Sequence, residues 1–359
     1  MRFRRIYLPL FPGVFALLLK GAGMLWPSSV EYFYSRGIYS PLTKIISAVS
    51  GIFPFGLGQV TAPILLILAL VWFVRSFSRG GFRKFLLALA SAISIVFFIF
   101  IFSWGLNYNR LPLGEALDWQ YGSVRQEDLR ALSEHLVGAL NESRPLIMED
   151  EDGVAHSGMG KTGLLKQAGV GYERLSVFLP WLTVKGVNLK PSLTPRLLSY
   201  SGITGYYLFY SGEGAVNLDM SEAEVAFTAM HEEAHRRGYS REDEANFLAV
   251  MAGLSHPDSF FHYAALLNAY IYASNALYSV DANGHATIYT SLCEETKRDL
   301  QNINDFWRSY KGPLEQVADR INDTYLQFSG VSDGTQSYGR VVDLLVYAWN
   351  NDFLPLSGS

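Results

Sequence analysis

Three long apolar stretches within the first 104 residues constrain this chain more than any other feature. They cover about residues 6–26, 57–77 and 85–104. About twenty apolar residues cross the hydrocarbon core of a bilayer, and a helix satisfies its own backbone hydrogen bonds there. We therefore expect residues 1–104 to form a membrane anchor of three transmembrane helices in the lipid bilayer. The first stretch is the weakest because Lys20 interrupts it, and a removed signal peptide is the alternative.

Charge is distributed unevenly along the chain. Residues 1–104 carry ten Lys or Arg and one acid, whereas residues 105–359 carry nineteen Lys or Arg and thirty-two acids. A basic, apolar first part and an acidic second part indicate an anchored domain rather than a nucleic-acid-binding protein. Basic residues gather before the first span and between the second and third, at residues 2–5 and 75–84. The positive-inside rule places both clusters in the cytoplasm, so residues after the third span should lie outside the cytoplasmic membrane.

The second part of the chain changes character twice. Residues 105–124 are polar with Pro and Gly, which predicts a linker, and residues 126–144 have apolar positions at helical spacing. Residues 187–220 are β-branched and aromatic with Gly and Pro, which predicts short strands and turns. From residue 221 the pattern is helical almost to the end. We therefore expect a mainly α protein, with a mostly helical α+β domain at residues 125–359.

The stretch "TAMHEEAHRRGYSREDEANFLA", residues 228–249, contains the candidate metal-binding residues. Ser221 and Glu224 form a capping-box pattern that starts a helix just before it. His231 and His235 then lie one turn apart on one helix face, where both can reach a common ion. This is the H-E-x-x-H arrangement, in which two histidines bind Zn²⁺ and the intervening glutamate, Glu232, is the general base. The alternative is a histidine pair on the surface of a metal-independent protein.

A second helix should follow the first at once. Gly238 suits the position just past a helix C-terminus, and Ser240, with Asp243 three residues on, suits a new N-terminus. The expected second helix covers residues 241–254. Its first turn carries three consecutive acids, and a catalytic zinc needs a third protein ligand.

The apolar face of this second helix selects among the acids. Glu244 lies one turn before Leu248 and so beside the apolar stripe, whereas Glu242 lies one turn before Asn246. We therefore favour Glu244 as the third ligand, with Glu242 as the alternative. The acids that bind no metal, Glu233 among them, are expected to face solvent or to favour the helix dipole.

The stretch "HEEAHRRGYSREDEANFLA" resembles the gluzincin metalloproteases, in which H-E-x-x-H is followed by a glutamate ligand on a downstream helix. Together with the apolar stretches, "FPFGLGQ", "SGITGYYLFYSGEGAVN" and "QSYGRVVDLL" resemble a bacterial membrane family, domain of unknown function 3810. The resemblance implies a zincin-like, membrane-anchored zinc metallopeptidase. It implies His231, His235 and Glu244 as ligands and Glu232 as the base.

The same resemblance implies a strand, upstream of the zinc helix, that holds a peptide substrate in extended form. The piece "GYYLFYSGEGAVNL", residues 205–218, occupies that position, and an ordinary hairpin that covers the core is the alternative. The substrate-binding candidates are Tyr206, Tyr207, Asn217, Tyr338 and Arg340. For a residue that stabilises an oxyanion, the candidates are His262, Tyr263, Tyr338 and Arg340.

The expected reaction is the hydrolysis of peptide bonds in envelope proteins or peptides. Zinc lowers the pKa of water and polarises the scissile carbonyl, and Glu232 transfers the proton to the leaving amine. The alternative is a non-catalytic scaffold or sensor that zinc stabilises. Such a site would be closed by a fourth ligand, for which His256 and His262 are the nearest histidines in sequence.

Overall fold

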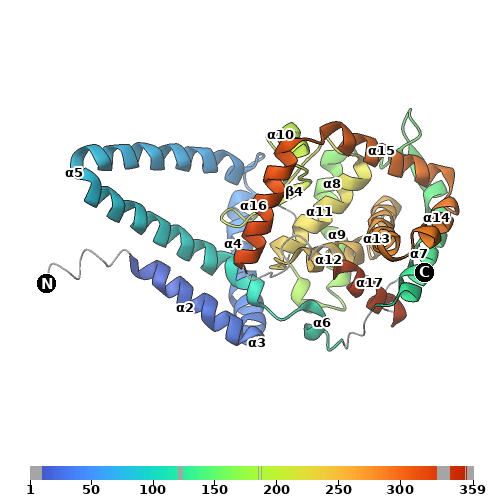
Figure 1. Cartoon of the computed structure of the whole chain (residues 1–359), viewed down its shortest axis with the longest axis horizontal. Coiled ribbons are helices and arrows are strands. Elements are labelled where there is room, and N and C mark those ends of the chain that lie inside the picture. Colours follow the sequence, from blue (N-terminus) through green and yellow to red (C-terminus); the bar gives the residue numbers. More distant parts are fainter. Residues whose placement is uncertain are drawn as a thin grey trace. The chain divides into compact units, whose positions relative to one another are not determined.

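The computed structural model describes residues 10–119, 124–184, 186, 188–329, 340–351 and 353, without the side chains of residues 76, 79, 80 and 83. The chain forms two compact units. Unit 1 comprises residues 1–111 and 208–213, and unit 2 comprises residues 112–207 and 214–359. The prediction of a mainly helical protein is confirmed, because the described strands are short and confined to two small sheets (Figure 1).

Unit 1 holds the apolar helices. Its elements are α2 (Phe11–Leu25), α3 (Pro27–Ser29), the π-helix η2 (Val30–Tyr39), α4 (Ser40–Ser50), α5 (Leu57–Ser103) and the 3₁₀ helix η3 (Gly105–Asn109). The long helix α5 turns back on itself at Gly81, whose φ of 69° is a conformation that glycine adopts readily. The two arms, Leu57–Arg75 and Lys84–Ser103, are each long and apolar enough to cross a membrane.

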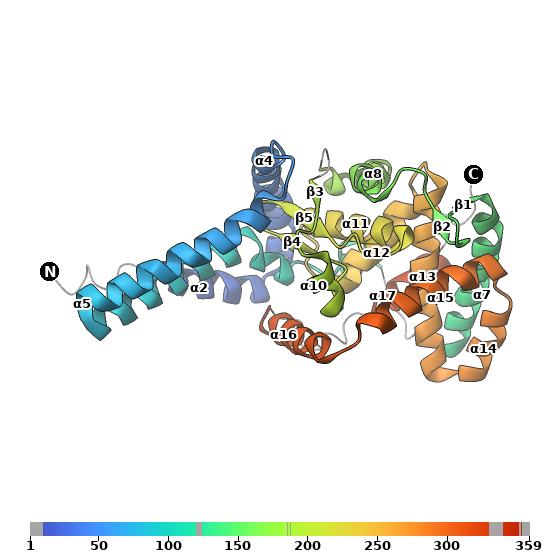
Figure 2. The same cartoon turned by 90° about the horizontal axis from the view of Figure 1, so that it is seen from above.

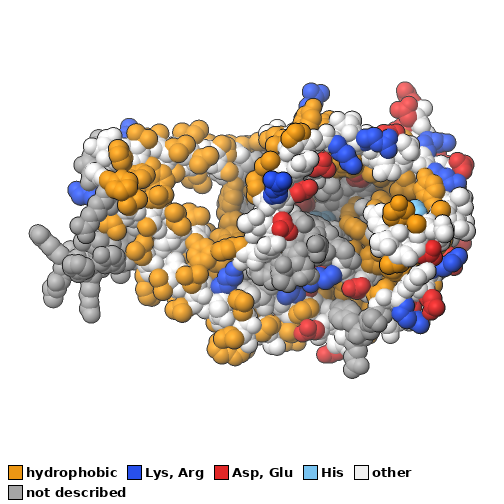
Figure 3. Space-filling model, in the orientation of Figure 1, with side chains coloured by type: hydrophobic (Ala, Val, Ile, Leu, Met, Phe, Trp, Pro, Cys, Tyr) orange, Lys and Arg blue, Asp and Glu red, His pale blue; other side chains and the backbone are white. Residues whose placement is uncertain are grey.

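The first expected span differs from the prediction. Helix α2 has only 15 residues, and residues 6–9 of the expected span lie outside the described part of the chain. Together with Pro27–Ser50, α2 forms a pair bent by 108°, which is either one broken span or a re-entrant loop. The described part of the chain therefore has two helices able to cross a membrane, or three if the bent pair is one span. Apolar side chains dominate the surface of α2 and α5 in Figure 3, as contact with lipid requires.

Unit 2 is built around four packed helices. Helix α13 (Ser259–Val280) packs against α7 (Gln126–Ser143), α11 (Glu222–Arg236) and α12 (Glu242–Leu254), and α11 also packs against α12 (Figures 1 and 2). The remaining elements are α6 (Leu113–Ala116), η4 (Arg144–Leu146), β1 (Met148–Glu149), β2 (Ala155–His156), α8 (Lys161–Gln167), α9 (Gly169–Leu175), η5 (Pro180–Leu182), α10 (Pro195–Tyr200), α14 (Ala282–Thr290), α15 (Glu294–Tyr310), α16 (Pro313–Ser329) and α17 (Val341–Asn350). The expected linker at residues 105–124 thus includes two short helices, η3 and α6.

A three-stranded sheet lies beside α11, as Figure 2 shows. Its order is β3 (Leu189–Pro191), β5 (Glu213–Val216) and β4 (Gly205–Leu208), so β5 is central and β4 is an edge strand. Strands β3 and β5 are parallel, with Lys190 opposite Ala215. The predicted strands within residues 187–220 are confirmed, although α10 interrupts them.

The turn between α11 and α12 follows most of the sequence prediction. Ser221 and Glu224 form the expected capping box, and Gly238 has a φ of 83°, which suits glycine just past a helix end. The predicted cap at Ser240 is wrong. The N-cap residue is Arg241, and the buried Ser240 hydroxyl makes no hydrogen bond within the described part of the chain.

Candidate metal centre

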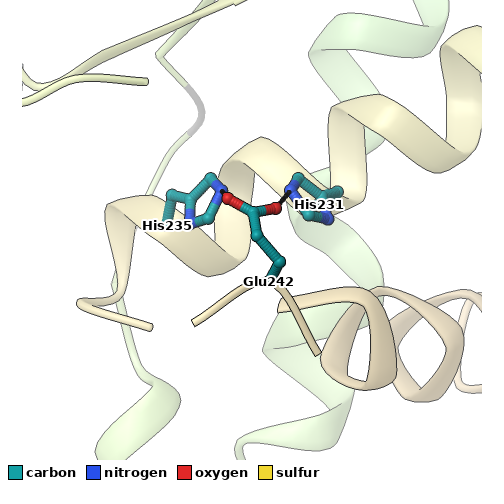
Figure 4. Close-up of side chains that lie close together, drawn as sticks. All are labelled: His231, His235 and Glu242. Atoms are coloured by element: carbon teal, nitrogen blue, oxygen red, sulfur yellow. Dashed lines mark ion pairs between the residues drawn. The ribbon is translucent and has the colours of Figure 1, made fainter. Parts of the chain in front are cut away.

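Helices α11 and α12 bring two histidines and one glutamate to a single point. His231 Nε2 lies 3.1 Å from one carboxylate oxygen of Glu242, and His235 Nε2 lies 3.6 Å from the other (Figure 4). The rings of His231 and His235 are nearly perpendicular, with centroids 4.6 Å apart. Candidate ligand atoms of all three residues lie within 4.8 Å of one another. The expected pairing of the two histidines at one point is therefore present.

The other ring nitrogen of each histidine has a fixed partner. His231 Nδ1 lies 2.7 Å from the side-chain oxygen of Asn246, and His235 Nδ1 lies 2.6 Å from the backbone oxygen of Tyr239. Both partners accept hydrogen bonds, so each Nδ1 carries a proton, and each Nε2 is the ring atom that could bind a metal ion. Such outer partners orient metal-binding histidines in proteins.

The structure places Glu242, not Glu244, beside the histidines. The Glu244 carboxylate points elsewhere: one oxygen accepts hydrogen bonds from the backbone N–H of Leu113 at 2.7 Å and from the Arg241 guanidinium at 3.0 Å. The sequence-based preference for Glu244 is therefore not supported by this geometry. Glu242, the alternative, replaces it as the candidate third ligand.

The apolar stripe could not distinguish the two acids because α12 has no solvent-facing side. All of its residues except Glu242 are buried, so an apolar stripe does not define an inward face. Glu242 and Asn246 lie one turn apart and both reach His231, one by the Nε2 side and one by the Nδ1 side. Sequence reasoning missed Asn246. Its signal was an uncharged polar side chain within the apolar run "ANFLAVMAGL", where a buried amide needs a partner.

Glu232 lies buried next to this point, under the β4–β5 hairpin. A Cβ atom at Gly205 would lie 2.5 Å from Glu232 Oε1, and one at Gly214 would lie 2.9 Å from Glu232 Cβ. Glycine at both positions thus lets the hairpin approach the carboxylate. Glu232 Oε2 is buried and has no hydrogen-bond partner among the described residues. An orphaned buried carboxylate oxygen calls for an explanation, such as a bound ligand, an ordered water or a catalytic role.

Burial and neighbouring charges shift the pKa values of the ionisable side chains at this point. Burial raises the pKa of Glu232 to about 8, and Glu242 raises it too, while His231 opposes the shift. Burial lowers the pKa of His235 to about 4. Burial also lowers the pKa of His231, but Glu242 outweighs it, so the net shift is upward. Without a cation, a buried carboxyl group is thus held neutral beside the histidines, and a divalent ion would reverse this by favouring the carboxylate.

The sequence predicted that the next residue, Glu233, faces solvent. This prediction is wrong, because Glu233 is fully buried. It accepts hydrogen bonds from Arg236 Nε at 2.9 Å and Nη2 at 2.7 Å, and from Arg237. Burial raises its pKa, but the two arginines outweigh this effect and lower it. Asp243 is also buried and pairs with Arg340 at 3.4 Å. Neither acid belongs to a solvated helix face.

The candidate substrate-binding residues separate into three groups. Tyr206 and Tyr207 are half-buried on the edge strand β4. Burial raises the pKa of Tyr206, and the charge of Glu232 raises it further, so the Tyr206 hydroxyl interacts electrostatically with Glu232. Asn217 is fully buried, and its amide bonds to Ser199, which gives it a structural role. Arg340 pairs with Asp243, and Tyr338 lies outside the described residues.

The other histidine and tyrosine candidates lie away from the histidine pair. Tyr263 donates to Asp299 in a buried network that also contains Arg144. His256 Nδ1 accepts a hydrogen bond from the backbone N–H of Asp258, and neither His256 nor His262 joins the metal-ligand group found among the described residues. Sequence reasoning also missed Tyr272 on α13. Burial raises its pKa, and the charge of Glu242 adds to this shift.

The comparison with known protein families identifies the chain. A family model described as "Protein of unknown function (DUF3810)" matches residues 34–346. The chain belongs to this family. The match spans both units and includes the three candidate ligands. No curated protein and no solved structure matches the DUF3810 chain.

Proposed function

We propose that His231, His235 and Glu242 bind one Zn²⁺ ion and that this DUF3810 protein is a zinc-dependent peptidase of the gluzincin type. The donor distances carry the proposal. A tetrahedral zinc site with bonds of about 2.0–2.1 Å places neighbouring donor atoms roughly 3.3 Å apart. His231 Nε2 lies 3.1 Å from one oxygen of Glu242 and His235 Nε2 lies 3.6 Å from the other, which are both close to that value, and ligand atoms of all three residues lie within 4.8 Å of one another. Two histidines and one carboxylate are also a ligand set that catalytic zinc sites use.

Three ligands rather than four favour catalysis over a purely structural site. The group contains no further His, Cys, Asp or Glu among the described residues. Catalytic zinc sites keep a position for water or substrate, whereas structural sites are closed by four protein ligands. A non-catalytic scaffold or sensor stabilised by zinc remains the alternative hypothesis, which the turnover assay below distinguishes.

Each residue around the ion would have a separate role in hydrolysis. Zinc supplies a Lewis acid that polarises a carbonyl and acidifies water. Glu232, with one unpartnered oxygen, accepts the proton of the attacking water and delivers it to the leaving amine. Asn246 and the backbone of Tyr239 hold the imidazoles in the ligand-competent tautomer. Strand β4 offers an edge for an extended peptide, with Tyr206 and Tyr207 along it.

The location of the site follows from charge. The basic clusters before the first span and within residues 75–84 favour the cytoplasmic side for those segments. We therefore propose a multi-pass protein of the bacterial cytoplasmic membrane whose unit 2 acts outside the cytoplasm on envelope proteins or peptides.

The test is peptide-library profiling of the full chain in detergent, with and without added zinc. Glu232→Gln should keep zinc bound but lower turnover by at least about 100-fold, since general-base catalysis contributes about 10²–10⁴. Glu222→Gln is the matched control, because Glu222 begins the same helix and accepts hydrogen bonds from Ser157 instead. Full activity in Glu232→Gln would exclude the proposed mechanism. Zinc binding without turnover on any peptide would favour the scaffold.

A further inference from the structure

The turn between β4 and β5 belongs to unit 1, although the strands themselves continue into unit 2. Its last residue, Glu213, has only 1 % of its surface exposed. Its two carboxylate oxygens accept hydrogen bonds from the first backbone N–H groups of α5, Leu57 at 3.0 Å and Gly58 at 2.6 Å. The N-cap residue of α5, Gly56, has no side chain to do this. A carboxylate from 155 residues further along the chain therefore caps the membrane helix.

Further hydrogen bonds hold the turn in place. Ser47 and Ser50 of α4 donate to the backbone oxygens of Gly212 and Ser211, at 2.9 and 2.6 Å. Tyr210 donates from its hydroxyl to the backbone oxygen of Gly58 at 2.9 Å. The turn is thus bound by the end of α4 and the start of α5 together.

The close approach depends on a glycine. A Cβ atom at Gly58 would lie 2.4 Å from Ser211 Oγ and 2.8 Å from Leu208 Cδ1. The pieces "FPFGLGQ" and "YSGEG" of the sequence, far apart along the chain, are therefore complementary parts of one contact.

The same hairpin flanks the candidate general base. Gly214 directly follows Glu213, and Gly214 and Gly205 are the two positions at which the hairpin closes over Glu232. Backbone hydrogen bonds continue the connection, from Gly214 N–H to Asn188 at 3.1 Å and from Asn217 N–H to Thr204 at 2.8 Å. A displacement of Glu213 would therefore also displace its neighbour Gly214, whose backbone lies beside Glu232.

We propose that Glu213 is a positioning residue, through which the N-terminus of the membrane helix α5 fixes the β4–β5 hairpin beside Glu232. The covalent bond from Glu213 to Gly214 would carry this positioning to the backbone next to Glu232. The catalytic consequence rests on the proposed function, whereas the positioning of the hairpin does not.

Hydrogen–deuterium exchange on the full chain in nanodiscs tests the positioning. Two variants break the contact in different ways: Glu213→Gln removes the charge from the cap, and Gly58→Ala inserts a methyl group and keeps Glu213. Both should accelerate exchange at the amides of Gly212, Gly214 and Asn217 by about tenfold, roughly the loss of one helix cap, while α13 stays unchanged. Asp281→Asn, which removes the charge from the cap of α14 as Glu213→Gln does from that of α5, is the matched control and should leave the hairpin protected.

Two results would overturn the proposal. One is unchanged protection of the hairpin in both variants. The other is equal acceleration in the hairpin and in α13, which would make the contact a general stability element. Where peptide turnover is measurable, Glu213→Gln should lower kcat by at least about tenfold and leave zinc affinity unchanged, because misplacement of a reacting group by about 1 Å costs up to 100-fold. Absence of zinc binding would refute the proposed function without altering the exchange result.

Discussion

Two consecutive glutamates on α11 are both buried, and their surroundings differ completely. Glu233 is bound by Arg236 and Arg237, and its pKa is lowered. Glu232 faces the histidine side, keeps an unpartnered oxygen, and has its pKa raised to about 8. A buried carboxylate that is fully paired stabilises the fold, whereas a buried acid with an unpaired oxygen and a raised pKa beside two histidines is a candidate for binding a ligand or a proton.

Removing the charge of Glu233 should lower stability far more than removing that of Glu232. Glu233→Gln leaves two buried guanidinium groups without their shared carboxylate, so the free energy of unfolding should fall by about 3–5 kcal/mol. Glu232→Gln replaces a group that is largely neutral at pH 7 with one of equal shape and should change stability by less than about 1 kcal/mol. Denaturant unfolding of the full chain in detergent with a chelator compares the two. Equal losses would remove the distinction between the two faces.

The second largest effect should be a loss of zinc affinity when Asn246, the partner of His231 Nδ1, is replaced. Asn246→Ala removes the acceptor that fixes the His231 tautomer, and zinc affinity should fall by about 10–100-fold, as for other outer-shell partners. Asn217→Ala is the matched control, since it is an equally buried amide that bonds to Ser199. Zinc titration with a competing chelator measures both. Equal affinity in wild type and Asn246→Ala would mean that Asn246 only fills space.

The sequence predicted that His231 and His235 lie together, but it did not place Glu242 beside them. His231, Glu232 and His235 are fixed by spacing on one continuous helix, which local pattern determines. The third ligand depends on how α12 packs against α11 after the turn at Gly238. Because α12 is buried on all sides, its amphipathic pattern carried no information about direction. Partners from distant segments, such as the Leu113 N–H that donates a hydrogen bond to Glu244, leave no signal in the local sequence pattern.

The fold shows the same division. Capping and helical periodicity predicted α7 and α11 closely, and the apolar runs predicted both arms of α5. The bent first pair was not predicted, because the π-helix after the break at Trp26 bonds to residues distant in sequence, Tyr34 to Phe102 and Ser35 to Asn107. The contact of Glu213 with α5 joins residues 155 positions apart, and a single sequence gives no sign of it.

A smaller loss of stability than that of Glu233→Gln should come from a substitution of the glycine that faces Glu232. Gly205→Ala would place a methyl group 2.5 Å from Glu232 Oε1 and should destabilise the fold by about 1–3 kcal/mol, the usual range for overpacking. Gly138→Ala in α7 has nothing within 4 Å and should instead stabilise by about 0.5–1 kcal/mol through helix propensity. Thermal unfolding compares the pair. A neutral Gly205→Ala would show that the hairpin does not close over the carboxylate.

The central claim is that His231, His235 and Glu242 form the metal site, and zinc content measures it most directly. The full chain, purified in detergent and dialysed against trace zinc, should hold about one zinc per chain, the value for a single site with three protein ligands. Glu242→Ala should lose the metal, and Glu244→Ala, whose carboxylate bonds to Leu113 and Arg241, should keep it. Retention of zinc by Glu242→Ala together with its loss in Glu244→Ala would contradict the account.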